Sequence, residues 1–243
     1  MVWLVRRLVL MSCLGCVAAI ATSCSALSGG DCRQEPPTAS AGVPDSFVVA
    51  FETSRGRFDA VARKAWAPMG VAHFYTLVRN HYYDGSRFFR VVQSFVAQFG
   101  IAGDPKVYDA WKDRCLADEP VRHTNSRGTI AYARGGPGTR SVQLFVNLRD
   151  NPQLDRLSGF GFPPIGEVVS GMNVVDSLYS GYGDAAPPSG PEPEAAGPSQ
   201  DSLMARGNAY LAQGWPKLDF IKTAHIVREW PARPSSSSSS GHP

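Results

Sequence analysis

Short apolar segments recur along the middle of this 243-residue chain, and large and smaller or polar side chains alternate within them. Turn residues such as Gly, Asp, Asn and Pro lie between the segments, a combination that is typical of β-strands joined by tight turns. The segments are 46–52, 57–62, 87–92, 94–100, 128–133, 143–148, 165–169 and 220–227. Many short strands of this kind fit a closed barrel. The sequence therefore predicts a mainly-β fold, a closed antiparallel eight-stranded β-barrel.

Two further segments have the periodicity of helices. Pro68 opens the first, and the second follows Gly171. Apolar side chains three or four positions apart share one face of a helix. They are Val71, Phe74, Tyr75 and Val78 in the first segment, and Met172, Val175 and Leu178 in the second. We expect these two helices to cap the open ends of the barrel.

The start of the chain has the features of an export signal. Arg6 and Arg7 precede the apolar stretch 8–21, which is short for a membrane span. The sequence ATSC that ends at Cys24 resembles a bacterial lipobox, in which the cysteine becomes lipidated. We therefore expect a lipoprotein-type signal peptide at 1–23, lipidation of Cys24 and a lipid anchor in the membrane. Ordinary cleavage nearby, which would give a soluble secreted protein, stays open.

Composition divides the rest of the chain. Residues 24–44 are rich in Ser, Gly, Pro and Ala and read as a flexible tether. One globular domain is expected at 45–229, with a Pro/Gly-rich surface loop at 183–200 and a Ser/Pro-rich tail at 230–243 that cannot bury apolar surface. Ser25 after the cysteine indicates an outer-membrane lipoprotein that faces the periplasm; a periplasmic or secreted protein is the other reading.

Charge and cysteines narrow the classes of function. The net charge of +3 is small and spread along the chain, so no nucleic-acid partner is expected. If Cys24 carries lipid, Cys32 and Cys115 remain as a possible disulfide, which an envelope compartment would permit. The sequence does not show whether the two cysteines meet.

Common catalytic and metal-binding motifs are missing. HExxH, GxSxG, the P-loop pattern and zinc-type Cys/His spacing do not occur, and 134–140 reads as a tight glycine-rich loop. His73 and His81 are too far apart for one helical face to offer both to a metal, so we expect them at the surface or at a helix end. We expect no metal and no cofactor.

Three polar side chains lie inside the apolar segments: Arg90, Gln98 and Gln143. An unpaired polar group out of water costs about 1–3 kcal/mol or more, so each needs partners. Each could face solvent or pair inside the fold. Together, next to phenylalanines and aliphatic residues, they favour a shared apolar groove with a few placed donors.

These polar residues lie in blocks that resemble the cyclophilin-type peptidyl-prolyl cis/trans isomerases. FFRVVQSFVAQFG at 88–100 is similar to the family pattern FHRVxxGFxxQGG. YARGGPGTRSVQLFVNL at 132–148 is similar to xAxAGPNTNxSQFFI, and 154–178 is similar to LDxxxxxFGxVxxGMxVVDxI. The blocks follow in the family's order and spacing, and the resemblance runs from about Val48 to Val227. Envelope members of bacteria look most similar.

The resemblance implies a site and an activity. Arg90 would be the catalytic arginine, Gln98 would bind the substrate backbone, and Gln143 would support the arginine from behind. The proline ring would lie among apolar side chains, and Ala133 and Arg134 would lie along the peptide groove. The apolar residues are Phe95, Val96, Phe145, Leu154 and Phe162. The implied function is isomerisation of X-Pro bonds in exported polypeptides by a monomer that assists folding in the cell envelope.

Four residues depart from the family's pattern. Arg134 stands where asparagine is common, Gln153 where tryptophan or phenylalanine is usual, and Phe162 where histidine or tyrosine is usual. Phe99 replaces a glycine, and we expect it to make the groove wall bulkier. These departures leave a second hypothesis open, a catalytically weak module that binds proline-containing peptides or partner proteins.

Overall fold

Three stretches of the chain, 32–34, 42–184 and 197–230, are described by the computed structural model. The expected signal peptide, Cys24, most of the tether, residues 185–196 of the insert and the tail from 231 lie outside the described residues. Their predicted roles stay predictions.

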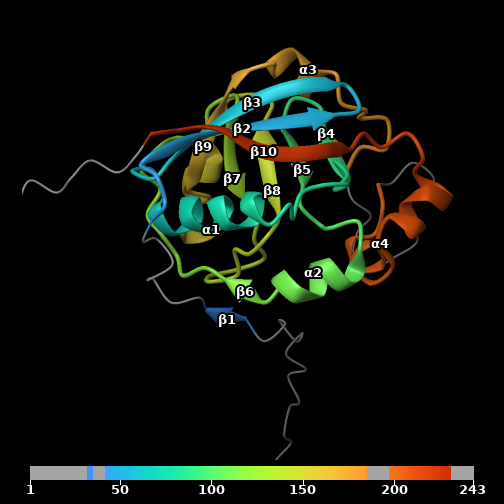
Figure 1. Ribbon diagram of the computed structural model, residues 1–243, viewed down its shortest axis with the longest axis horizontal. Helices are drawn as coiled ribbons and strands as arrows, with labels where there is room; N and C mark the ends of the chain where they lie inside the picture. Colours follow the sequence, from blue (N-terminus) through green and yellow to red (C-terminus); the bar gives the residue numbers. More distant parts are fainter. Residues whose placement is uncertain (1–31, 35–41, 185–196, 231–243) are drawn as a thin grey trace, which may run out of the picture. The chain divides into compact units, whose positions relative to one another are not determined.

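One curled antiparallel sheet organises the domain (Figure 1). All eight predicted segments form strands in it, so the mainly-β prediction is confirmed. The strands follow the spatial order β10-β2-β3-β9-β7-β8-β5-β4. Their bounds are β2 Ser46–Thr53, β3 Gly56–Arg63, β4 Arg90–Val92, β5 Val96–Phe99, β7 Thr129–Tyr132, β8 Leu144–Asn147, β9 Pro164–Ser170 and β10 Ile221–Trp230.

The closed barrel that we predicted is not found among the described strands, because the edge strands β4 and β10 are not paired along a ladder. The buried side chains of Phe88 and Phe89 lie just before β4, in a segment that forms no ladder with β10. A short bridge joins the two edges instead. The amide of Phe88 donates to Asp219 O (2.9 Å), and the amide of Ile221 donates to Ser86 O (2.9 Å). The sheet is a curled half-barrel.

Four α-helices accompany the sheet in the described residues, where we predicted two. α1 (Pro68–Arg79) packs against β3, β9 and β10, and α3 (Met172–Asp176) packs against β3. α2 (Pro105–Trp111) and α4 (Gln200–Gly214) pack against each other and were missed. None of the helices in the described stretches is long and apolar enough to cross a membrane.

The main core fills the space between α1 and the concave side of the sheet (Figure 1). His73 belongs to this buried region, so its predicted surface position is wrong: the face of α1 that carries it meets the rings of Trp111 and Tyr132.

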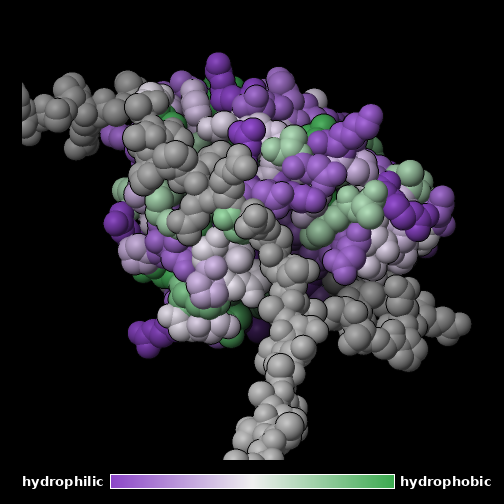
Figure 2. Space-filling view, turned by 90° about the horizontal axis from the view of Figure 1, so that it is seen from below, coloured by the Kyte–Doolittle hydropathy of each residue, from purple (hydrophilic) through white to green (hydrophobic). Residues whose placement is uncertain are grey.

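Seen from the side of α2 and β6 (Arg114–Cys115), the residues not drawn in grey are mostly hydrophilic, with small apolar groups between them (Figure 2). The largest core side chains are Phe47, Phe51, Phe58, Phe74, Tyr82, Tyr83, Phe88, Phe89, Phe99 and Tyr132.

A disulfide fixes the first described residues to the domain. Cys32 pairs with Cys115, and β1 (Arg33–Gln34) runs parallel to β6 beside this bond. The pairing that the sequence left open is therefore present. Such bonds persist in oxidising compartments.

A buried ion pair holds the N-terminus of α1. The carboxylate of Glu119 accepts the backbone N–H groups of Met69 (2.7 Å) and Gly70 (3.0 Å), which are free donors at the start of a helix. The same carboxylate accepts Nη1 of Arg140 (3.0 Å), whose side chain is fully buried. One carboxylate thus joins the helix to the loop that precedes β8.

Replacing Glu119 by glutamine should be strongly destabilising, because it leaves the Arg140 guanidinium buried without its counter-charge. We expect Glu119→Gln to lower the free energy of unfolding by about 3–5 kcal/mol, measured by urea denaturation. Glu167→Gln breaks a partly exposed pair with Arg63 and should cost less than about 1 kcal/mol. Equal losses in the two variants would contradict the role of the buried pair.

Candidate active site

Strands β5, β7 and β8 are buried along their whole length, on both faces. Alternate side chains enter the main core, and the others form a second, smaller apolar cluster on the opposite face. Val96, Ala131, Phe145 and Leu154 make up this second cluster, and Phe95, Ala133 and Phe162 pack against it. An apolar pocket therefore lies on the face of the sheet that turns away from the main core.

Phe99 lies on the other side of β5 from this pocket. Its ring is fully buried in the main core, where it packs against Phe51, Tyr83 and Phe88. The expectation that Phe99 makes the groove wall bulkier is therefore wrong. The alternation along β5 explains it, because Val96 and Gln98 face the pocket while Ala97 and Phe99 face the core.

Strand register places the predicted polar residues in one row beside the pocket. Arg90 on β4 lies opposite Gln98 on β5, and Gln98 lies opposite Phe145 on β8. Nη1 of Arg90 donates to Oε1 of Gln98 (3.3 Å), and Nε2 of Gln98 donates to Oε1 of Gln143 (2.8 Å). Gln143 thus reaches the arginine through Gln98 and not directly. The guanidinium also lies 5.6 Å from the centre of the Phe95 ring.

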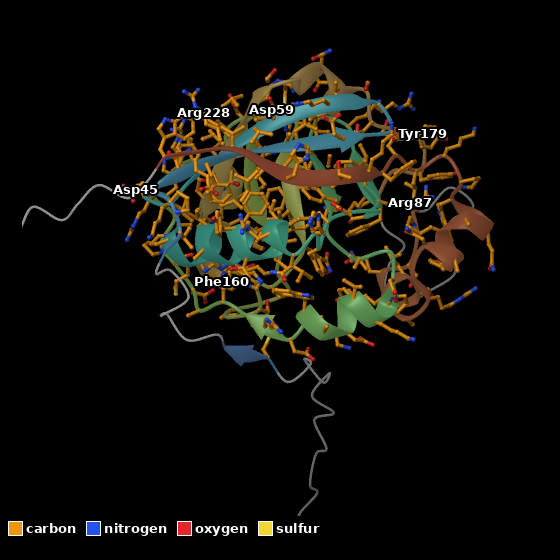
Figure 3. All side chains as sticks on the ribbon, in the orientation of Figure 1. Asp45, Asp59, Arg87, Phe160, Tyr179 and Arg228 are labelled. Carbon is orange, nitrogen blue, oxygen red and sulfur yellow. A yellow bond between two sulfur atoms is a disulfide. The ribbon has the colours of Figure 1, made fainter. Side chains whose placement is uncertain are left out.

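A cavity of about 690 Å³ brings all of the predicted catalytic and substrate-binding residues together. They are Arg90, Phe95, Val96, Gln98, Ala133, Arg134, Gln143, Phe145, Leu154 and Phe162. A larger hollow of about 1100 Å³ lies over β2, β3 and β10, near Asp45, Asp59 and Arg228 (Figure 3). Five of the ten residues around that hollow are exposed. None of the three polar residues Arg90, Gln98 and Gln143 lies there.

Arg134 supports the pocket wall from behind. Its side chain is fully buried, ion-paired with Asp118 and hydrogen-bonded to Gly161 O. The guanidinium lies 4.0 Å from the centre of the Phe160 ring, labelled in Figure 3, and 5.5 Å from that of Phe162. Burial lowers the pKa of Arg134, against the opposing effect of Asp118. With these partners, the guanidinium holds Phe162 in place.

A second network, of hydrogen bonds around Asn125 and Asp155, also supports the wall that contains Phe162. Nδ2 of Asn125 donates to Phe162 O (2.9 Å) and to Oδ1 of Asp155 (2.8 Å), and Thr124 Oγ1 donates to the same carboxylate (2.6 Å). Burial raises the pKa of Asp155, but the hydrogen bonds from Thr124 and Asn125 outweigh it and bring the pKa below its ordinary value. Asp155 directly follows Leu154, whose side chain faces the pocket.

Seven residues that line the cavity were not predicted: Tyr108, Gly135, Thr139, Ser141, Leu157, Asp184 and Gln200. Tyr108 from α2 shares a side-chain hydrogen bond with Gln143, and burial raises the pKa of Tyr108 to about 12. Asp104 followed by Pro105 is an N-cap and first-turn signal that could have revealed α2, since the Asp104 side chain accepts the amide of Lys106 (2.8 Å). Asp184 lies at the start of the low-complexity insert, which was read as a plain surface loop.

The arrangement combines an apolar pocket with a permanently charged donor at its rim. The linked side chains of Gln98 and Gln143 orient the Arg90 guanidinium, and none of these groups has to gain or lose a proton. Within the described stretches, no three His, Cys, Asp or Glu side chains come close enough to hold a metal ion. The geometry is suited to binding an apolar ring and stabilising a change of charge next to it.

Acidification should weaken the hydrogen-bond network around Asp155. The carboxylate of Asp155 contributes stability above its unfolded pKa of about 3.9, and this contribution is lost as the pH falls through the lower folded pKa. We expect the gap in free energy of unfolding between wild type and Asp155→Asn to be largest above about pH 4. It should narrow towards about pH 2.5, measured by urea unfolding. Asp109→Asn controls for the loss of one carboxylate; a gap for Asp155→Asn that is independent of pH would contradict the assignment.

Comparison with protein families agrees with the resemblance seen in the sequence. Residues 48–194 match the family model described as cyclophilin type peptidyl-prolyl cis-trans isomerase/CLD. A peptidyl-prolyl cis-trans isomerase of Streptomyces antibioticus is 33% identical over an alignment of 142 residues, and the match covers 54% of this chain and 82% of the relative. Peptidyl-prolyl cis-trans isomerase B of Escherichia coli is 30% identical over 142 residues, 54% of this chain and 83% of the relative.

Solved structures share the fold. A cyclophilin type peptidyl-prolyl cis-trans isomerase of Cryptosporidium parvum matches with a TM-score of 0.54 and 19% identity, over 76% of this chain and 99% of that one. Its structure in the presence of the dipeptide Ala-Pro matches with a TM-score of 0.52. The pocket, the matched motifs and these similarities agree, and the chain belongs to the family of cyclophilin-type peptidyl-prolyl cis-trans isomerases.

Proposed function

We propose that this protein accelerates the cis/trans isomerisation of X-Pro bonds in exported polypeptides and so assists their folding in the cell envelope. The observation that carries the proposal is the guanidinium of Arg90, held by Gln98 at the rim of an apolar pocket. The Ala-Pro dipeptide present with the Cryptosporidium structure supports a proline-containing substrate. Exchange at an X-Pro bond takes tens to hundreds of seconds without catalysis, which is slow enough to limit folding.

The chemistry needs a donor that acts on the twisted amide. Rotation about the peptide bond costs about 18–20 kcal/mol because the nitrogen lone pair is conjugated with the carbonyl. When the bond twists, that lone pair becomes localised and can accept a hydrogen bond from Arg90. The planar ground state offers no such acceptor at nitrogen, so the arginine stabilises the transition state selectively. The walls of Phe145 and Leu154 exclude water, which strengthens the interaction.

Gln98 and Gln143 act as supports in this scheme. Because the guanidinium of an arginine offers its donors in a rigid planar fork, its orientation decides which acceptor Arg90 can reach. The hydrogen bond from Arg90 to Gln98 fixes one edge of the guanidinium, and the bond from Gln98 to Gln143 fixes the glutamine in turn. We expect the backbone of the substrate to lie along Ala133, which borders the same cavity.

Two features support a site of action outside the cytoplasm. The first 23 residues have the pattern of a signal peptide, with a lipobox-like sequence that ends at Cys24. The disulfide between Cys32 and Cys115 suits an oxidising compartment. We therefore propose a lipid-anchored envelope protein, on the periplasmic side of the outer membrane.

A second candidate function is a binding module with little catalysis. The observation that favours it is the ion pair between Arg90 and Asp184, which engages the proposed catalytic donor. Wild-type protein that binds proline peptides without accelerating their exchange would support this alternative.

Removal of the arginine should separate catalysis from binding. We expect Arg90→Ala to lower kcat/KM by about 10²–10³-fold, as is typical for loss of one transition-state donor, measured by NMR exchange on an Ala-Pro peptide. Binding to the apolar pocket should largely persist. Arg57→Ala, which removes an exposed arginine paired with Asp59, serves as the control and should leave the rate unchanged. Unchanged exchange in Arg90→Ala would overturn the arginine assignment.

The lipid anchor is tested separately. We expect Cys24→Ser, expressed as the full-length chain in a bacterial host, to shift the protein from the membrane fraction to the soluble fraction. Metabolic labelling with a fatty-acid probe should mark the wild type and not the variant. Membrane retention of the unlabelled variant would point to another anchor.

A further inference from the structure

Asp184 is bound to the proposed catalytic arginine. Nε of Arg90 donates to Oδ1 of Asp184, and Nη2 donates to Oδ2 (3.3 Å), so the carboxylate covers one whole edge of the guanidinium. Nη1 is already hydrogen-bonded to Gln98 on the other side. The donor that should act on the substrate is therefore engaged by protein acceptors on both sides before a substrate arrives.

The backbone around Asp184 is fixed by its own contacts. The amide of Gly197 donates to Asp184 O (2.7 Å), which joins the two described ends of the insert. The amide of Gly183 donates to Ser180 O (2.9 Å), and the Ser180 hydroxyl accepts Nε2 of Gln93 (2.9 Å), in the turn after β4. Segment 180–184 thus lies alongside the edge strand that carries Arg90, and Asp184 itself lines the cavity.

The exposure of the two side chains indicates that a substrate can break the ion pair between Arg90 and Asp184. The side chain of Asp184 is 62% exposed and that of Arg90 is 21% exposed. Ion pairs of this kind are weak, and salt screens them. The pair between Arg140 and Glu119 is different, because both side chains are almost completely buried. A substrate can therefore displace Asp184, whereas nothing in solution reaches Glu119.

We propose that Asp184 is an internal competitor of the substrate for the Arg90 guanidinium. The proposal rests on the proposed function, in which Arg90 acts on the X-Pro bond. While Asp184 is bound, its negative charge offsets the field of the guanidinium, and productive binding requires that the carboxylate leave. The affinity for proline peptides and the rate are then both lower than the pocket alone would allow.

Neutralising the carboxylate should increase activity. We expect Asp184→Asn to raise kcat/KM on an uncharged proline peptide by about two- to fivefold, which is about 0.4–1 kcal/mol at about 1.4 kcal/mol per factor of ten. The dissociation constant of the peptide should fall by a similar factor, because the Asp184 carboxylate lines the cavity and must leave before the peptide lies next to Arg90. Raising the salt from about 0.05 to 0.5 M should increase wild-type activity and leave Asp184→Asn almost unchanged.

Controls separate this effect from a general loss of charge or structure. Asp176→Asn removes another exposed carboxylate that is paired with an arginine, Arg127, away from the cavity, and should change neither rate nor affinity. In an Arg90→Ala background, Asp184→Asn should no longer alter peptide affinity, because the competition acts through the arginine. Asp184→Ala, with thermal unfolding as a check on folding, should repeat the result of Asp184→Asn.

The outcomes also distinguish this inference from the proposed function. If wild type accelerates exchange and Asp184→Asn leaves it unchanged or slower, the inference is overturned and the proposed function stands. If wild type does not accelerate exchange, the proposed function fails. The effect of Asp184→Asn on peptide affinity then still tests whether Asp184 competes with the peptide. An affinity change that persists without Arg90 would also overturn the inference.

Discussion

The fold depends on three strands that are buried on both faces. β5, β7 and β8 send alternate side chains into the main core and into the pocket, so one backbone positions both. A shift of register by one residue would exchange the two sets and place Phe99 in the pocket and Gln98 in the core. The large rings of the core thereby determine where the functional side chains lie, because they hold the register that places Arg90, Gln98 and Phe145 in one row.

Polar groups beside an apolar pocket need partners, and here each polar side chain is hydrogen-bonded to the next. Arg90, Gln98 and Gln143 are linked by side-chain hydrogen bonds, and the chain continues to Tyr108 on α2. Each amide is oriented by its neighbours, so the guanidinium is held without a buried counter-charge beside the proline pocket. The opposite wall follows the same rule, since Arg134 and Asn125 hold Phe162 through contacts behind it.

Alternation let the sequence predict all eight strands, and the matched motifs named ten residues that line one cavity. What it missed depended on contacts between distant parts of the chain. His73 looks like a helix-surface residue until Trp111 from α2 covers it, and Phe99 looks like part of the groove unless its neighbour Gln98 is assigned to the pocket face. The gap between β4 and β10 depends on how two segments far apart in the sequence meet, at the single bridge between Arg87 and Phe220, and no periodicity of a single strand reveals it.

Two arginine–carboxylate pairs show how burial decides the role of the same interaction. Arg140 and Glu119 are shielded from water, and removal of either partner leaves a charge that nothing can solvate, so this pair is a permanent part of the structure. Arg90 and Asp184 lie at the rim of a cavity, where water can replace either partner at little cost. A cation beside an apolar pocket benefits from a resting partner, but a partner as deeply buried as Glu119 would never yield to a substrate. An exposed carboxylate at the rim of the cavity meets both requirements.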